Sequence, residues 1–147
     1  MTEPTAVGSI HVSARPRTVY GLISDPAGRG RPLAAGERFR AARRVRLLAR
    51  RRTATVIQAV PDRCFAFRVT ALGRPVSTWR YDIVPTAYGC RVTGSTRDRR
   101  GPLLRVLLRI GAGALDRAAR NHRDVEWALA ALKAAAEELE RRSAGRE

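Results

Sequence analysis

Apolar and polar positions alternate in two parts of the chain, and alternation of this kind is typical of β-strands with one buried face. Near the start, Ile10 and Val12 alternate with polar neighbours, and we expect this strand to end at Ala14. The same period returns from Gly36 onward and continues through Val92. The sequence therefore predicts one strand near the N-terminus and several more in the middle of the chain.

Turn residues separate the middle strands at short intervals. Pro61-Asp62, Leu72-Gly73 and the segment from Ala87 to Gly89 combine residues that favour tight turns. Strands joined by such short turns pair in antiparallel fashion. We therefore expect an antiparallel sheet in which neighbouring strands follow one another along the chain.

Apolar residues with helical spacing lie on both sides of these strands in the sequence. Pro16 suits the first turn of a helix that runs to Ile23 and ends before Asp25-Pro26. The following segment, up to Gly36, is rich in glycine and proline and is expected to be a loop.

A second helical pattern begins at Pro102 and continues almost to the end of the chain. Gly111 and Gly113 weaken it, so the segment forms either one helix or two. Its apolar positions are spaced alternately by four and three residues, which places them on one buried stripe. The stripe consists of Leu104, Leu108, Gly111, Leu115, Ala118, His122, Val125, Leu129, Leu132, Ala136 and Leu139. Because this stripe must cover the apolar face of the sheet, the order of elements predicts an α+β fold.

The composition agrees with a single folded domain that spans residues 1–147. Hydrophobic residues make up 44% and charged residues 29%, which excludes a collagen-like or wholly disordered chain. Only the first few residues and the segment from Ser143 to Glu147 are expected to be disordered ends. The net charge of +16 brings polyanionic partners into consideration. Lys133 is the only lysine, however, and a GC-rich coding sequence produces the same excess of arginine.

Features of other protein classes are missing from the sequence. Cys64 and Cys90 are too few for a disulfide framework, and we expect reduced thiols. The N-terminal residues lack the basic and apolar regions of a secretory signal, so we expect a cytoplasmic protein. The apolar run from Leu103 to Leu115 is interrupted by Arg105 and Arg109 and is shorter than the roughly 20 residues that a membrane-spanning helix needs.

Five segments of the chain carry motifs in a fixed order. In one-letter form they read IHV with ARPRTVYGLISDP (from Ile10 to Pro26), GERF (from Gly36), PDRCFAF (from Pro61), STWRYDIVP with GCRVT (from Ser77 to Thr93), and LAALKAAAE (from Leu129). Together they resemble the START-like superfamily, also called SRPBCC, and most closely its polyketide cyclase/dehydrase branch. The resemblance covers nearly the whole chain.

This resemblance implies a helix-grip fold, in which a curved antiparallel sheet wraps around a long C-terminal helix. In relatives, the two enclose an apolar cavity that holds lipids, sterols, polyketides or plant hormones. Members include aromatases, cyclases, lipid carriers and receptors, so the fold does not select one activity. Relatives commonly carry a second helix and a Trp-containing segment after the Asp-Pro, where this chain has only a short segment from Ala27 to Ala35. The sequence leaves open how the cavity closes on that side.

Strand alternation places one set of residues on the face that the helix covers, as walls of a ligand cavity or as a packed core. The set consists of Phe39, Phe65, Phe67, Val69, Trp79, Tyr81, Ile83, Cys90 and Val92, and the opposite face carries Arg38, Arg40, Arg68, Arg80, Asp82 and Arg91. As ligand-binding residues we predict Phe39, Phe67, Trp79, Tyr81 and His122. The Tyr81 hydroxyl and the Trp79 indole are the polar groups of this set.

Catalytic and metal sites have little support in the sequence. His122 lies on the helix stripe, where it could exchange a proton with a ligand, but a lone helical histidine is usually structural. No second histidine or paired carboxylate completes a catalytic set, and the scattered His and Cys residues form no ligand cluster. We therefore predict no catalytic residue, no metal and no cofactor. An enzyme of this type would be a cyclase or aromatase that uses His122, Tyr81 or an inward arginine.

The sharpest charge feature is a run of eight arginines without an acid between Arg38 and Arg52. It is either a solvated face or a surface for nucleic acid or another polyanion. For the second interpretation, the predicted contact residues are Arg43, Arg44, Arg50, Arg51 and Arg52. Phe39 is the only aromatic residue in the run, which argues against base stacking. The basic segment from Leu103 to Arg123 offers a further alternative, contact with an anionic membrane surface.

The main functional hypothesis is the binding of an apolar small molecule, such as a lipid or polyketide, between the sheet and the C-terminal helix. We expect binding rather than catalysis. The alternatives are a polyanion-binding protein that uses the arginine run, and a cyclase or aromatase. The sequence identifies neither the ligand nor the oligomeric state.

Overall fold

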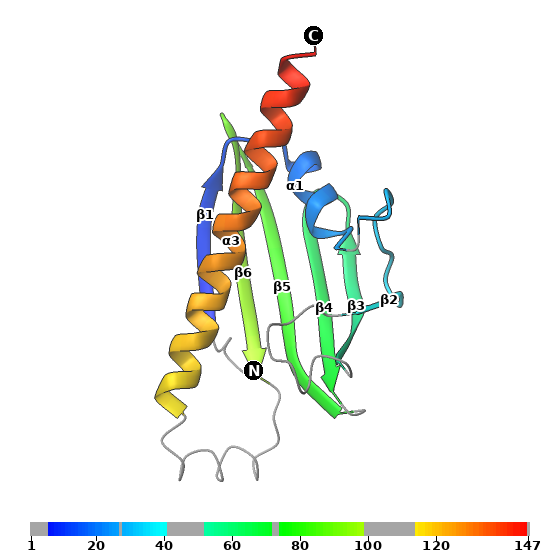
Figure 1. The fold of residues 1–147 in the computed structure, drawn as a ribbon, viewed down its shortest axis with the longest axis vertical. Coiled ribbons are helices and arrows are strands. Elements are labelled where there is room, and N and C mark those ends of the chain that lie inside the picture. Colours follow the sequence, from blue (N-terminus) through cyan, green and yellow to red (C-terminus); the bar gives the residue numbers. More distant parts are fainter. Residues whose placement is uncertain (1–5, 27, 41–51, 72–73, 99–113, 147) are drawn as a thin grey trace.

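A computed structural model describes residues 6–26, 28–40, 52–71, 74–98 and 114–146, apart from the side chains of residues 40, 52, 71, 74–76, 98 and 114–122. The elements in this part of the chain are β1 (Ala6–Val12), α1 (Pro16–Ile23), β2 (Arg38–Arg40), β3 (Arg52–Val60), β4 (Cys64–Ala71), β5 (Arg74–Thr86), β6 (Gly89–Asp98) and α3 (Ala114–Ala144). Figure 1 shows the strands side by side with the long helix α3 across them.

The strands form one antiparallel sheet in the order β1-β6-β5-β4-β3-β2. From β2 to β6 each strand pairs with the next one in the chain, and β1 returns to pair with β6. The short turns between β3 and β4 and between β5 and β6 fall where the sequence predicts them. The predicted α+β helix-grip fold is therefore confirmed.

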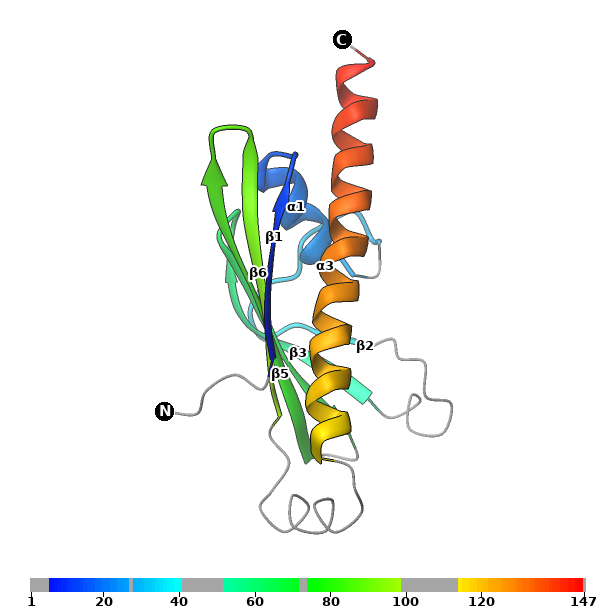
Figure 2. The ribbon, with the colours of Figure 1, turned by 90° about the vertical axis from the view of Figure 1, so that its left-hand side faces the viewer.

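Both described helices lie on one side of the sheet, as Figure 2 shows. The long helix α3 packs mainly on β1 and β6, whereas α1 packs on β4 and β5 and also contacts α3. The face that the helices cover is called the inner face here. Alternation along the strands places Phe65, Ile83, Cys90 and Val92 on it, and all four belong to the buried core.

Side-chain size changes across the inner face, because strand register places small and large residues in the same cross-strand rows. One row contains Gly8, Gly94, Tyr81 and Phe65, and the next contains Ala6, Thr96, Trp79 and Phe67. A Cβ atom added to Gly8 would lie 3.1 Å from Cγ1 of Val125 on α3. The glycines therefore let α3 approach β1 and β6 closely, while the aromatic residues lie beyond the helix.

Two boundaries in the fold differ from the sequence prediction. The first strand ends at Val12 rather than at Ala14, because its pairing partner β6 begins at Gly89 and the last β1–β6 pair is Val12 with Cys90. The C-terminal helix continues to Ala144, which lies inside the segment for which the sequence predicts a disordered end.

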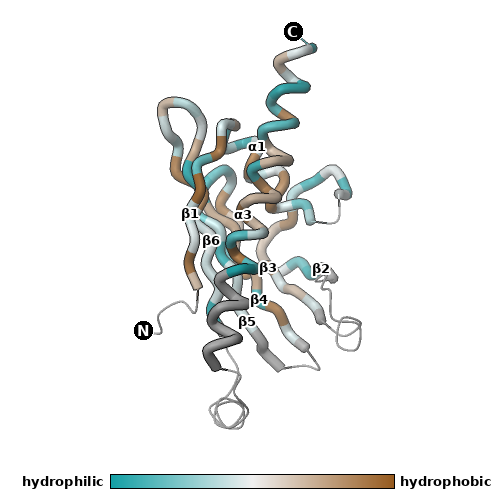
Figure 3. Tube along the Cα trace, turned by 60° about the vertical axis from the view of Figure 1, so that its left-hand side comes forward, coloured by the Kyte–Doolittle hydropathy of each residue, from teal (hydrophilic) through white to brown (hydrophobic). Residues whose placement is uncertain are grey.

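The predicted buried stripe of α3 holds for Val125, Leu129 and Ala136, which are buried, but not for Leu139, which is 41% exposed. The last turns of α3 project past the sheet, and Figure 3 shows that this end of the helix is largely hydrophilic. The prediction for Leu139 was wrong because helical spacing does not reveal where the covering sheet ends. The stripe positions from Leu104 to Gly111 lie outside the described residues, as do the side chains of Leu115, Ala118 and His122.

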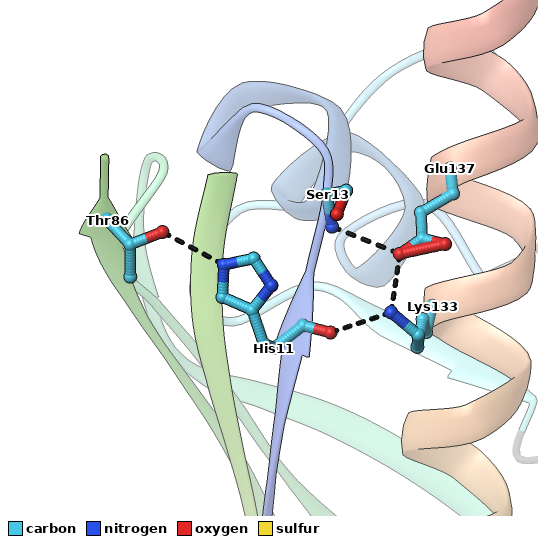
Figure 4. Close-up of polar contacts among 5 residues, drawn as sticks. All are labelled: His11, Ser13, Thr86, Lys133 and Glu137. Atoms are coloured by element: carbon cyan, nitrogen blue, oxygen red, sulfur yellow. Dashed lines mark hydrogen bonds and ion pairs between the residues drawn. The ribbon is translucent and has the colours of Figure 1, made fainter. Parts of the chain in front are cut away.

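Polar contacts fasten α3 to the connection between β1 and α1 (Figure 4). The Ser13 backbone N–H donates to Oε1 of Glu137 at 3.1 Å, and the Lys133 ammonium donates to the His11 carbonyl oxygen at 3.0 Å. One turn further along the helix, Glu140 accepts hydrogen bonds from Arg15 and from the Thr18 hydroxyl. We call these contacts of Glu137 and Glu140 the carboxylate clamp. It joins the helix on β1 and β6 to the start of the helix on β4 and β5.

Candidate functional site

An apolar pocket of about 230 Å³ lies between α1, α3 and the strands that α3 does not cover. Five elements and one loop contribute to its wall. The lining residues are Leu22 and Ile23 at the end of α1, Pro26 after it, Phe39 on β2, Phe67 on β4, Tyr81 on β5 and Leu132 on α3. None of these seven side chains carries a charge at neutral pH.

Contacts between aromatic rings hold the strand side of the pocket. The Phe67 ring packs edge-on against the Phe39 ring with their centroids 5.2 Å apart. The Phe67 ring also stacks on the Trp79 ring, with a centroid distance of 6.5 Å. Phe65 lies 6.1 Å from Phe67 and is completely buried. Phe67 is therefore supported by rings on three sides, which restricts its movement toward the pocket.

Tyr81 supplies the one hydroxyl group of the pocket wall. Among the described residues no group forms a hydrogen bond to this hydroxyl, and the side chain is only partly buried. Burial raises the pKa of Tyr81 to about 12, because the phenolate would lose its hydration. The hydroxyl therefore keeps its proton at neutral pH and can act as a hydrogen-bond donor.

Local hydrogen bonds order the segment that follows α1. Ser24 ends the helix by donating from its N–H and its hydroxyl to the Tyr20 carbonyl oxygen. The Asp25 carboxylate accepts from the N–H groups of Arg29 and Gly30, and the Leu33 N–H donates to the Ser24 carbonyl oxygen at 2.8 Å. Leu33 is buried in the core. The short segment after the Asp-Pro thus folds back on the end of α1, with Pro26 at the pocket.

The structure brings together three of the five residues for which the sequence predicts ligand binding. Phe39, Phe67 and Tyr81 line the pocket, and Trp79 supports it from behind Phe67 without lining it. His122 belongs to α3, but its side chain lies outside the described residues.

Four lining residues are absent from the predicted set, namely Leu22, Ile23, Pro26 and Leu132. The signal for Leu132 is its place on the helix stripe, and the signal for Leu22 and Ile23 is the apolar cluster that ends α1. Neither signal shows which part of the sheet a helix faces, so the sequence does not assign these residues to a ligand site.

The arginines predicted for polyanion binding fall mostly outside the described residues. Arg43, Arg44, Arg50 and Arg51 are not described, and of Arg52 only the backbone, at the start of β3, is described. Within the run, Arg38 is the one arginine with a described side chain, and it is exposed.

The remaining candidate chemistry is limited. Cys64 and Cys90 are free and buried, and burial raises the pKa of both thiols, which keeps them protonated. In the described part of the chain, no three His, Cys, Asp or Glu residues form a group that could hold a metal ion. None of the described helices is both long and apolar enough to cross a membrane.

An antiparallel sheet that curves around a C-terminal helix, with an apolar pocket between them, defines a START-like helix-grip protein. The family model described as polyketide cyclase / dehydrase and lipid transport matches residues 3–137. The chain therefore belongs to this family, which is the polyketide cyclase/dehydrase branch of the superfamily. A comparison with curated proteins gives no significant match.

Solved structures with the same fold are distant in sequence. The Polyketide_cyc-like protein Cgl2372 from Corynebacterium glutamicum has a TM-score of 0.57 and 22% identity, with 95% of this chain and 94% of that chain covered. The Aha1 dimer from Colwellia psychrerythraea has a TM-score of 0.56 and 12% identity (90% and 95% covered). CalU16 from Micromonospora echinospora has a TM-score of 0.52 and 16% identity (95% and 81% covered). At these identities the likeness shows the fold alone.

Proposed function

We propose that this protein binds an apolar small molecule in the pocket between α1, α3 and the aromatic half of the sheet. The observation that carries the proposal is the pocket of about 230 Å³ with seven uncharged lining residues. A dry apolar cavity of about 150 Å³ is large enough to bind benzene. Removal of an apolar ligand from water favours binding by about 25 cal/mol per Å² of buried surface.

The volume also limits the size of the ligand. Pockets for drug-sized molecules have volumes of about 300 to 1,000 Å³, so this pocket is below that range. It suits a molecule of one or two rings, or one end of a longer chain. The protonated Tyr81 hydroxyl favours a ligand with a carbonyl or hydroxyl oxygen at the matching position.

The proposal is for binding rather than turnover, because of the seven lining residues only Tyr81 titrates. With a pKa of about 12, Tyr81 is not a general base at neutral pH. His122 remains the candidate acid or base for a cyclase-type reaction, and it lies ten residues, about 15 Å, along α3 from the lining residue Leu132. Turnover of a polyketide-type substrate that His122→Ala abolishes would replace the binding proposal with an enzymatic one.

The test uses two neutral ligands, 2-acetylnaphthalene and 2-ethylnaphthalene, which differ in one carbonyl oxygen. Binding is followed by isothermal titration calorimetry, which does not depend on the tryptophan content of the variants. We expect both ligands to bind the parent protein. Leu132→Trp, which fills the pocket, should weaken both about tenfold or more, whereas Leu139→Trp on the exposed side of the same helix should not.

Tyr81→Phe separates the polar contact from the apolar ones. A hydrogen bond contributes about 0.5–1.5 kcal/mol, so the variant should bind 2-acetylnaphthalene about two- to tenfold more weakly and 2-ethylnaphthalene unchanged. Failure of both ligands to bind, or equal effects of Leu132→Trp and Leu139→Trp, would overturn the proposal.

A further inference from the structure

The outer face of the sheet carries a row of arginine and threonine side chains that runs across five strands. Cross-strand pairing joins Arg38 to Thr55, Thr55 to Arg68, Arg68 to Thr78, and Thr78 to Arg97. We call these five residues the arginine row. Their neighbours along the strands face the core, so alternation directs the row to the face that neither described helix covers (Figure 2).

Within the described residues, the three arginines of the row have no acidic partner. The side chains of Arg38, Arg68 and Arg97 form no ion pair or hydrogen bond with any residue in the described part of the chain. In the neighbouring outer-face row, by contrast, the Arg80 guanidinium donates to Asp82 at 2.9 Å and to Gln58 at 3.0 Å. The charge of Arg80 is therefore neutralised by a neighbour, whereas the three arginines of the row are available to an external anion.

Two polar atoms at the centre of the row are buried without a hydrogen-bond partner. They are Nε of Arg68 and Oγ1 of Thr78, on directly paired residues of β4 and β5. An unsatisfied buried polar group costs about 1–3 kcal/mol, so such groups are rare in folded proteins and call for a structural or functional reason. Arg68 as a whole is only partly buried, which leaves its terminal nitrogens within reach of a ligand.

The spacing of the arginines favours an extended anion over a single small one. Neighbouring strands lie about 4.8 Å apart, so arginines on β2, β4 and β6 are separated by about 10 Å each and span about 20 Å in total. The guanidinium group matches phosphate oxygens with paired N–H donors. A chain of phosphates meets this arrangement, whereas one phosphate reaches only one or two of the three arginines.

The composition of the row also distinguishes between partner classes. It contains no aliphatic or aromatic side chain that could anchor a protein interface or insert into a membrane. It also offers no ring for base stacking, so recognition would rest on the backbone alone. A flexible single strand follows the twisted sheet of Figure 1 more readily than a rigid duplex does.

We infer that the arginine row binds the phosphodiester backbone of a single-stranded nucleic acid without regard to its bases. This site lies on the opposite face of the sheet from the pocket and does not depend on the proposed function. It places the polyanion contact on described strands and shares only Arg38 with the arginine run that the sequence singled out.

The test compares two variants that lose the same charge. Arg38→Gln/Arg68→Gln/Arg97→Gln removes the row. The control, Arg17→Gln/Arg29→Gln/Arg123→Gln, removes three exposed arginines from α1, the following loop and α3. Both lower the net charge of +16 by three. A fluorescent single-stranded oligonucleotide of about 16 nucleotides is titrated between 50 and 200 mM salt.

We expect the parent protein to bind homopolymer and mixed sequences alike at low salt. Each phosphate contact on a single strand contributes about −0.7 to the slope of log K against log salt. The row variant should therefore lose about two units of slope, and the control well under one. If the row variant does not fold, Arg38→Gln and Arg97→Gln are measured singly, each with an expected loss of about 0.7.

Three outcomes would overturn the inference. The first is an absence of oligonucleotide binding by the parent protein, and the second is an equal loss in the row variant and the control. The third is binding to phosphatidylserine vesicles, but not to oligonucleotides, that the row variant abolishes, which would assign the surface to a membrane. Binding of 2-acetylnaphthalene to the row variant should be unchanged, so failure at one site is distinguishable from failure at the other.

Discussion

The inner face of the sheet has a packed half on β1 and β6, which α3 covers closely, and an open half on β4 and β5, which borders the pocket. On β1 and β6, glycines and small residues let α3 approach so closely that a Cβ on Gly8 or Gly94 would lie 3.1 Å or 3.4 Å from its side chains. On β4 and β5, Phe67 and Tyr81 hold the covering elements apart, and a pocket of about 230 Å³ remains. Close packing on one side thus fixes the helix that forms a wall on the other.

The largest expected effect on stability is at Gly89, where β6 begins beside the end of β1. Gly89 has φ 152°, and a Cβ there would lie 2.1 Å from the Val12 carbonyl oxygen. Gly89→Ala should therefore lower the free energy of unfolding by about 3 kcal/mol or more, as measured by urea denaturation. Gly21→Ala is the matched control, because nothing lies within 4 Å of its Cβ position in α1. It should stabilise the protein by about 1 kcal/mol.

Added side-chain volume should lower the stability much more in the packed half than in the open half. Gly8→Val forces atoms against Val125 and should cost about 1–3 kcal/mol of stability, with part of the loss recovered by Val125→Ala. Leu132→Phe places its extra atoms in the pocket and should change stability by about 1 kcal/mol or less. Equal losses in thermal or urea unfolding would contradict the distinction between a packed half and an open half.

The dependence of stability on alkaline pH tests whether Tyr81 is buried in the open half. Its pKa in the folded protein is raised to about 12 from the usual 10.0, so the folded state retains a proton that the unfolded state releases. This contribution to stability is complete below pH 10, is reduced by about 1.4 kcal/mol at pH 11, and disappears above pH 12. Tyr81→Phe should flatten the alkaline loss of stability, whereas Tyr88→Phe, at an 88% exposed side chain, should not.

The smallest expected effect concerns the carboxylate clamp between the two halves. Hydrogen bonds from Lys133 and Ser13 lower the pKa of Glu137, and those from Thr18 and Arg15 lower the pKa of Glu140. The stabilisation is therefore present above the ordinary carboxyl pKa of 4.5 and is lost as the pH falls through the lowered values.

Glu137→Gln/Glu140→Gln should cost about 1 kcal/mol or less at pH 7 and should reduce the dependence of stability on pH below 4.5. Glu138→Gln is the comparison variant, because the pKa of Glu138 is also lowered but its partners among the described residues, Arg141 and Arg142, lie on its own helix. It should change the acid profile less than the double variant does. An unchanged acid profile in the double variant would show that the clamp does not contribute to stability.

Features that depend on local pattern could be predicted from the sequence. Pro16 and Asp25-Pro26 determine the bounds of α1, because proline fixes φ and lacks an N–H group. Strand alternation places Phe67 and Tyr81 on one face and Arg68 and Arg80 on the other, because successive side chains point to opposite sides. The family resemblance supplied the helix-grip arrangement, which no single motif specifies.

The site depends on distances between segments that are remote in the sequence, and only the tertiary structure shows these. Leu22 and Leu132 meet at one pocket because α1 and α3 pack on different strands. The β-bulge between Val56 and Gln58 shifts the pairing of β3, which no alternation pattern reveals.

Arg38, Arg68 and Arg97 share a row only through the register of five strands. The sequence by itself thus determined which residues face inward, since that follows from a local period. Which of them touch, and where space remains between them, depends on pairing register and helix placement, which are set by packing across the whole molecule.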